Sequence, residues 1–239
     1  MKRFLVMPVL AAVLFTAACG EDGDLMGAGP TGSVRFFNAT TGIAGSSGFT
    51  ANGKFANGSA LASGQPAQSC AEVSEGPASF AFGAANTGGT GLSGNALTTL
   101  DNQVVTAGGN YTVAAAGSAP SPTLFMLDNN FAGALAANEA AVRFVNLAPA
   151  TGTALNTFTV LKGVLGQGHT LVQSGIAVGA PSTFNTVTSG SSVYTILKGH
   201  ETVISGSAAT LNLQAGSVNT VAIVPNASGG FQLVNVPRC

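Results

Sequence analysis

A short segment of this chain occurs twice, and its return limits most strongly what the chain can fold into. Residues 34–38 read Val-Arg-Phe-Phe-Asn, and residues 142–146 read Val-Arg-Phe-Val-Asn, 108 positions later. The same offset separates two segments of the form Ala-Gly-x-x-x-Thr-Val-Ala, at 107–114 and 215–222. Segments that return in the same order at a fixed spacing indicate an internal tandem repeat.

A third pair of segments lies between these anchors. Residues 72–82 and 186–196 share Val-x-x-Gly before an alternating strand pattern, but their offset is 114. The second copy therefore carries about six extra residues before this point, and the first copy carries them after it. The surplus of the first copy is visible as the Gly-rich stretch 83–96. We therefore expect two units of about 100 residues, 33–136 and 137–239.

The composition favours an all-β fold for these units. The chain has 239 residues, of which 46% are hydrophobic, and its 33 glycines and 10 prolines are spread along it. Runs of four to eight strand-forming residues fill the spaces between these turn residues. In the second unit we expect strands near 140–147, 155–161, 183–188, 192–198, 208–213, 218–224 and 231–236. Seven short strands in about 100 residues predict two tandem immunoglobulin-like antiparallel β-sandwiches.

Side chains of the repeated strand should alternate between two faces. Val142 and Phe144 are predicted to face the sandwich core, and Arg143 and Val145 to lie on the outer face. There the aliphatic stem of the arginine would run along its neighbours. Arginine also binds carboxylate or phosphate with two parallel hydrogen bonds. Because Arg35 holds the same position in the first unit, we favour a structural role for both arginines.

The amino terminus has the three parts of a secretory signal peptide. Lys2 and Arg3 precede the apolar run 4–15, and the small residues 16–18 follow it. This arrangement predicts export, with a signal peptide at 1–18, and the apolar run is too short for a lasting membrane span.

Positions 17–19 resemble the lipobox of bacterial lipoproteins, in which two small residues precede a cysteine that becomes acylated. Thr16 stands where leucine is usual, so ordinary cleavage before Cys19 remains an alternative. The polar, Gly-rich segment 19–32 would serve as a flexible tether. Gly20 is not aspartate, which favours the outer over the inner membrane where a cell has both. We expect an envelope protein anchored by a lipid on Cys19.

The chain has three cysteines. Acylation of Cys19 would leave Cys70 and Cys239, which we expect to form a disulfide in an oxidising compartment. Two free thiols are the alternative.

The two units resemble the bacterial family called domain of unknown function 4397. Members open with a Val-Arg-hydrophobic strand that ends in Asn or His, and later carry a Gly-led strand and an Ala-Gly-x-x-Thr-Val strand. The second unit matches at Val142, Arg143, Asn146, Pro149, Gly190, Gly216, Thr220 and Val221. The first unit lacks the proline, and together the units cover roughly 31–239. The resemblance implies exported, often lipid-anchored, immunoglobulin-like sandwiches, and it implies no activity.

Charge and candidate side chains give little indication of chemistry. Charged residues make up 7% of the chain, and a net charge of −1 offers no basic patch for nucleic acid. The histidines, His169 and His200, both lie in turn-like sequence without a second metal ligand at a suitable spacing. The segment Gly-Thr-Gly-Leu-Ser-Gly at 89–94 has the dinucleotide-binding spacing, but no strand-turn-helix context surrounds it. The acids after the tether are Glu72, Glu75, Asp101, Asp128, Glu139 and Glu201.

We therefore expect no catalytic residues, no cofactor and no metal. The favoured function is a non-catalytic binding or structural module of the cell envelope. Its partners would be the membrane, through Cys19, and an envelope polymer or a surface protein. An alternative is a carbohydrate-active enzyme, which requires at least two of the acids in one cleft. Another is a solute-binding module, which requires a sizeable pocket between the units.

Overall fold

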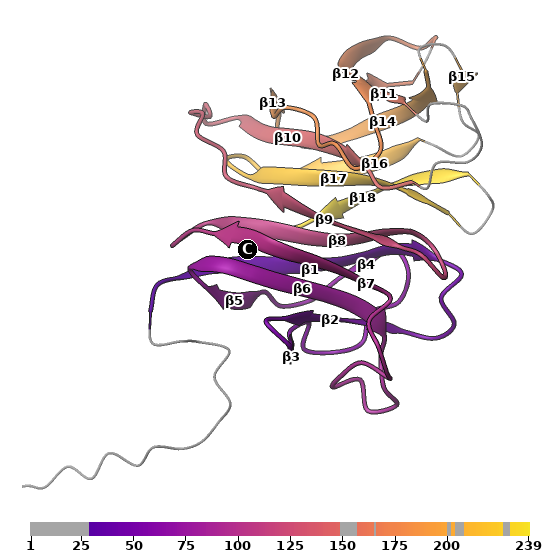
Figure 1. Ribbon diagram of the computed structural model, residues 1–239. Helices are drawn as coiled ribbons and strands as arrows, with labels where there is room; N and C mark the ends of the chain where they lie inside the picture. The colour runs from indigo at the N-terminus through magenta and orange to yellow at the C-terminus, as the bar shows by residue number, and fades with distance from the viewer. Residues whose placement is uncertain (1–28, 149–156, 165, 200–201, 204–207, 227–229) are drawn as a thin grey trace, which may run out of the picture.

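The computed structural model describes residues 29–148, 157–164, 166–199, 202–203, 208–226 and 230–239. In these ranges every regular element is a strand, which confirms the predicted all-β class (Figure 1). None of the described segments forms a helix long and apolar enough to cross a membrane. The expected signal peptide, 1–18, and Cys19 lie outside the described residues.

The first half of the chain forms two facing sheets. One sheet has the strand order β3-β2-β6-β7, and the other has the order β4-β1-β8-β9 with β5 paired to β1. The strands are β1 (Thr31–Thr41), β2 (Ser47–Ala51), β3 (Lys54–Phe55), β4 (Gln65–Pro66), β5 (Ala71–Ser74), β6 (Gly76–Ala84), β7 (Thr98–Val105), β8 (Asn110–Ser118) and β9 (Thr123–Asp128). Between the sheets lies a core rich in phenylalanine, with Phe36, Phe49, Phe80 and Phe82 fully buried.

The second half repeats this arrangement. Its sheets have the orders β13-β10-β17-β18 and β12-β11-β14-β15, and β16 pairs with β14. The strands are β10 (Glu139–Asn146), β11 (Phe158–Gly163), β12 (His169–Ile176), β13 (Asn185–Thr188), β14 (Gly190–Lys198), β15 (Thr202–Val203), β16 (Ala209–Leu213), β17 (Val218–Pro225) and β18 (Phe231–Val236). Phe144, Phe158 and Ile196 are among the buried residues of its core.

The sheets are not purely antiparallel, which corrects one part of the prediction. β1 runs parallel to β8, with Arg35 opposite Thr112, and β10 runs parallel to β17, with Arg143 opposite Thr220. Two-residue hairpins cannot make such a pair, because parallel strands need a long connection. Here the connection from β1 to β8 contains β2–β7, and the connection from β10 to β17 contains β11–β16.

Equivalent glycines begin β6 and β14. Gly76 lies opposite Val105 on β7, and Gly190 lies opposite Leu213 on β16. Both glycines have a positive φ, 113° and 106° respectively, which side-chain-bearing residues rarely adopt. The shared Val-x-x-Gly segment therefore marks the same turn between two strands in each half.

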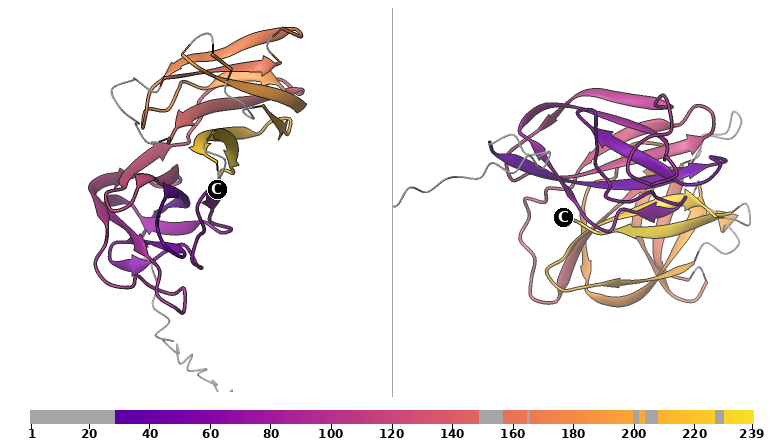
Figure 2. Two further views of the ribbon diagram at one scale, coloured as in Figure 1. Left: turned by 90° about the vertical axis from the view of Figure 1, so that its right-hand side faces the viewer. Right: turned by 90° about the horizontal axis from the view of Figure 1, so that it is seen from below.

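The two halves pack through a third hydrophobic cluster, here called the contact layer. It contains five buried residues from each half: Phe37, Ala39, Ala114, Ala116 and Leu127 from the first, and Val145, Leu147, Ala222, Val224 and Val236 from the second. The cluster joins the sheet of β1 to the sheet of β10, so four sheets lie in one stack (Figures 1 and 2). The two central sheets are consequently buried on both faces.

The repeated Val-Arg-Phe segment has the same structural role in each half. Its buried asparagine ends the strand by accepting a hydrogen bond from the main-chain N–H two residues further on. The acceptors are Asn38, for Thr40, and Asn146, for Ala148, both at 3.0 Å. Each asparagine also donates its side-chain amide to a main-chain carbonyl. An asparagine that bonds its local backbone in this way stabilises a turn.

The predicted strands of the second half agree with the structure, but two strands were not predicted, β12 and the two-residue β15. The expected strand at 231–236 coincides with β18, and the one at 218–224 differs from β17 by one residue. The longer of the two is β12, which begins at His169 in sequence that reads as a turn. Its burial does not alternate, because its first three residues are all exposed, so the period-2 signal is absent.

Candidate functional site

Arg143 lies in the boundary between the two halves and not on an open outer face. Only 5% of the residue is exposed, because the first half covers this face of β10. Its Nη2 donates to Oδ1 of Asn129 at 2.6 Å, and its Nε donates to the hydroxyl of Thr220 at 3.0 Å. Asn129 in turn donates to Thr112 of the first half at 2.8 Å. The predicted outer face exists, but another sheet occupies it.

The charge of Arg143 is held among apolar and aromatic groups. Its guanidinium lies over the ring of Phe184, with 4.7 Å between Cζ and the ring centroid. Phe184 packs edge-on against Phe131, from the connection between the halves. Burial lowers the pKa of Arg143 to about 10, and the carboxylate of Asp128 acts in the opposite direction. These contacts support a structural role in joining the halves.

Arg35, the equivalent residue of the first half, forms its hydrogen bonds in the described structure within its own half. Its Nη1 donates to the main-chain carbonyls of Ala67 at 2.5 Å and Gln68 at 3.2 Å. Burial lowers the pKa of this arginine as well. The two arginines share a strand position but have different partners, and they do not form a paired anion clamp.

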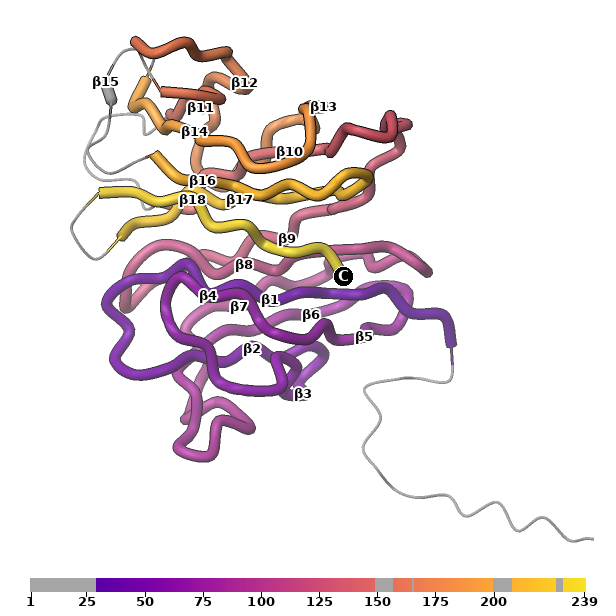
Figure 3. The backbone as a smooth tube through the Cα atoms, turned by 180° about the vertical axis from the view of Figure 1, so that it is seen from behind, coloured from indigo at the N-terminus to yellow at the C-terminus, as the bar shows by residue number. Residues whose placement is uncertain are grey.

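Cys70 and Cys239 are joined by a disulfide in the structure, with an S–S distance of 2.02 Å and Cα atoms 6.0 Å apart. The bond links the residue before β5 to the last residue of the chain. The C-terminus accordingly lies beside the first half (Figure 3).

The acidic side chains do not converge on a hollow. Of the six acids, Glu201 lies outside the described residues, and the other five are Glu72, Glu75, Asp101, Asp128 and Glu139. Glu72 accepts hydroxyl hydrogen bonds from Thr31 and Ser33, and Glu139 accepts the N–H of Ala136. None of these five acids lines any of the three hollows described below. The geometry thus offers no observation in favour of the carbohydrate-active enzyme.

Neither His169 nor the Gly-rich loop belongs to a metal-binding cluster in the described part of the chain. His169 begins β12 and is exposed, and His200 lies outside the described residues. Within the described ranges, no group of three or more His, Cys, Asp or Glu side chains could hold a metal ion. The 89–94 segment lies between β6 and β7, where Ala85 bridges Leu92.

The contact layer fills the space in which a solute-binding cleft was considered. Its ten apolar side chains are at most 3% exposed. Gly179 of the second half also approaches Phe125 of the first so closely that an added Cβ would lie 2.1 Å from a ring carbon. The two halves therefore meet as packed surfaces along this boundary.

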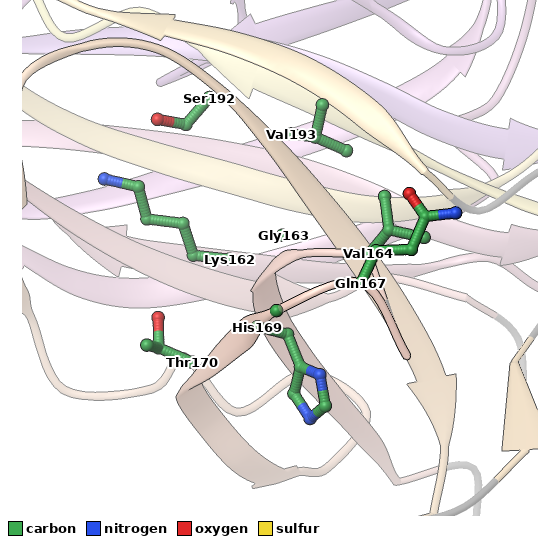
Figure 4. A pocket seen from close by; sticks show the side chains of 9 residues that line it. Lys162, Gly163, Val164, Gln167, His169, Thr170, Ser192 and Val193 are labelled. Carbon is green, nitrogen blue, oxygen red and sulfur yellow. The ribbon is translucent and has the colours of Figure 1, made fainter.

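The hollows lie instead along other parts of the second half. The largest of the three described here, of about 660 Å³, lies between the β11–β12 loop and the start of β14 (Figure 4). A second, of about 330 Å³, lies between β12 and β13. Lys162 and Thr170 line both, so the two hollows adjoin, and we call them together the Lys162 mouth. A third, of about 520 Å³, lies near Arg238 at the C-terminus.

Three adjacent strands bring the polar side chains of the Lys162 mouth together. Lys162 of β11 lies directly opposite Thr170 of β12 and Tyr194 of β14. Ser192 lies two residues before Tyr194, so these side chains share one face of the sheet. In Figure 4 the side chains of Lys162 and Ser192 extend toward the same side, whereas the ring of His169 points away from them. The sequence analysis did not single out this lysine.

Comparison with known proteins agrees with the predicted resemblance. A family model described as "Domain of unknown function (DUF4397)" matches residues 32–154, more than half of the chain. No curated protein matches the chain.

Proposed function

The chain belongs to the DUF4397 family, whose description names no activity, and from this premise we propose that it is a non-catalytic binding module of the cell envelope. The module consists of two copies of one immunoglobulin-like unit, 33–136 and 137–239. A lipid on Cys19 holds it at a membrane, and the segment 19–32 is its tether. Its partner is an envelope polymer or another surface protein.

The observation that carries the binding role is the Lys162 mouth. Ligand sites are typically hollows of about 300–1,000 Å³ with a few polar groups at fixed positions. Both parts of the mouth fall in this range, at about 660 and 330 Å³. The contact layer supports this role, because it packs the second half against the first over a wide apolar face. The strands that line the mouth are therefore held on a fixed support.

Two equivalent pairings support the two-copy proposal. In each half an arginine lies opposite a threonine in a parallel strand pair. A glycine of positive φ also begins an equivalent strand, β6 in the first half and β14 in the second. Chance agreement of sequence spacing would not produce the same strand register twice. The lipid anchor rests on the amino-terminal sequence alone.

A co-sedimentation experiment tests the binding role. The mature protein is incubated with the insoluble envelope fraction of cells that lack it, and the supernatant is assayed for released sugars. We expect the protein in the pellet and no released product. Released sugar would overturn the non-catalytic assignment, and protein that stays in the supernatant would overturn the binding role.

The anchor has its own test. Intact mass of the membrane-extracted protein should correspond to a chain that begins at an acylated Cys19. An unmodified chain beginning at Cys19, or one that begins elsewhere, would contradict the anchor.

A further inference from the structure

The Lys162 mouth carries a positive charge, and no acid lies among its described lining residues. In the described part of the chain the Lys162 ammonium donates to the main-chain carbonyl of Thr188, at 3.4 Å. Glu139 pairs with Thr188 across the strands, but its carboxylate accepts the N–H of Ala136. Glu139 also precedes Ala140, a core residue, and so faces away from the core side on which Lys162 lies. A lysine ammonium in a hollow whose described lining has no acid favours an anionic ligand.

The equivalent position in the first half shows that the fold does not need this lysine. Lys162 lies opposite Tyr194, and Ala51 lies opposite Phe80, in strands that occupy the same place in the two halves. Ala51 and Phe80 are buried parts of the first core, with 2% and 0% exposed. The second half thus has an ammonium and a phenol where the first has a methyl group and a phenyl ring.

Ser192 is a second polar residue at a position where the first half has an apolar one. Its equivalent is Ala78, two residues after Gly76 as Ser192 is two residues after Gly190, and Ala78 is buried in the first core. A position that packs well with alanine gains no packing from a serine hydroxyl. Polar groups that replace core residues at the open end of a sandwich are suited to binding.

The remaining lining indicates how the ligand would be held. Hydroxyl or amide side chains come from Gln167, Thr170, Asn185, Thr186 and Thr188. Among the described lining residues only His169 carries an aromatic ring, and this ring points away from Lys162 and Ser192 (Figure 4), so the mouth offers hydrogen bonds and one charge rather than a stacking platform. A ligand rich in hydroxyl groups matches this lining.

We propose that the Lys162 mouth binds a single oxyanion, carboxylate or phosphate, carried by a hydroxyl-rich ligand of the size of an acidic sugar unit. This proposal rests on the binding role proposed above and names the ligand class for it. The oxyanion accepts from the Lys162 ammonium and the Ser192 hydroxyl, and the sugar hydroxyls bond the lining of threonines and amides. A hydrogen bond between charged partners is about twice as strong as a neutral one, so the anion should dominate the affinity.

The test is a titration of the mature full-length chain followed by amide chemical shifts. The probes are galacturonate, galactose 6-phosphate, inorganic phosphate and the neutral sugar galactose. We expect saturable shifts at residues 162, 170 and 192 with one or both acidic sugars, and at least tenfold weaker binding of galactose. Which acidic sugar binds more tightly assigns the oxyanion as carboxylate or phosphate. Inorganic phosphate binding as tightly as the acidic sugars would overturn the hydroxyl-rich part of the proposal.

Matched lysine variants complete the design. Lys162→Gln should weaken binding of the acidic sugar at least tenfold, and Lys162→Arg should retain it within about threefold. Lys198→Gln removes an exposed lysine from the other end of β14 and should change nothing. An amide spectrum of each variant shows whether it is folded. Equal loss in the Lys162 and Lys198 variants, or shifts confined to the hollow near Arg238, would overturn the proposal. If the protein binds the envelope fraction but no acidic sugar, the ligand proposed for the Lys162 mouth is wrong and the binding role proposed above still stands.

Discussion

At the scale of single residues, Tyr194 shows what a polar group in the second core costs. Its hydroxyl is fully buried and has no hydrogen-bond partner in the described part of the chain. Tyr111, the other tyrosine, bonds the hydroxyl of Thr106 at 2.7 Å. A buried hydroxyl without a partner destabilises a fold by about 1–3 kcal/mol. The equivalent residue of the first half, Phe80, has no such group.

Tyr194→Phe should therefore raise the free energy of unfolding by about 1 kcal/mol near neutral pH. Tyr111→Phe, which loses a hydrogen bond, should lower it by about the same amount. Urea unfolding followed by circular dichroism measures both. A stabilised Tyr111 variant, or a destabilised Tyr194 variant, would contradict this account of the second core.

The same tyrosine predicts a pH dependence. Burial raises the pKa of the Tyr194 phenol above its ordinary value of about 10. Above pH 10 the unfolded chain releases a proton that the folded chain retains, so the free energy of unfolding falls as pH rises. The contribution is complete below the unfolded pKa and is lost as pH passes through the folded one. Tyr194→Phe should flatten this alkaline decline, as measured by urea unfolding at pH 8 and at about pH 10.5. An identical decline in the variant and the parent would disprove it.

At the scale of strands, central and edge positions should respond differently to the same change. Val145 of β10 is fully buried in the contact layer, whereas Leu171 of β12 is 62% exposed. Threonine keeps a good strand propensity at both sites. Val145→Thr buries a hydroxyl and should lower the free energy of unfolding by about 1–3 kcal/mol. Leu171→Thr should change it by less than about 0.5 kcal/mol. Urea unfolding measures both variants. Equal changes in the free energy of unfolding would show that Val145 is not shielded from water in the contact layer.

These two strands also show how far sequence reasoning reached. The spacing of turn residues and strand formers predicted most strands of the second half, because both signals are local. It could not show what covers the outer face of β10, since that depends on residues from the other half. A signal was nevertheless present: Phe37 and Val145 are apolar on the face that should have been polar. Apolar residues on both faces are typical of a strand buried on both sides.

The Lys162 mouth was missed for a related reason. Lys162 continues the inward-facing series of Phe158 and Val160, and a lone lysine in such a series draws no attention as a site. Its meaning depends on Thr170 and Ser192, which come from strands separated along the chain. One of these strands, β12, was itself not recognised.

At the scale of the whole molecule, the disulfide should determine much of the stability. Cys70 and Cys239 are 169 positions apart, so the bond restricts a very long loop in the unfolded chain. The chain-entropy model gives about 5 kcal/mol for a loop of this length. Cys239→Ser should lower the free energy of unfolding by about that amount.

The matched variants are Cys70→Ser and the double variant, measured by the same unfolding experiment under oxidising conditions. All three should be equally destabilised, because removing either partner removes the bond. Additive losses would indicate two independent thiols. Intact mass after alkylation, with and without prior reduction, gives a second measurement: only the reduced sample should carry two additional alkyl groups.

The contact layer also imposes an order in time on the newborn chain. The first half is complete once residue 128 has been made, but Val236, the last member of the layer, is added 108 residues later. At a synthesis rate of about 5–20 residues per second, roughly 5–20 s pass before this face is covered. During that interval Phe37, Ala39 and Leu127 form an uncovered apolar surface on an otherwise completed sandwich. During this interval the uncovered faces of two growing chains compete with the second half for the same contact. The second half prevents such pairing only if it folds onto the face before another chain does.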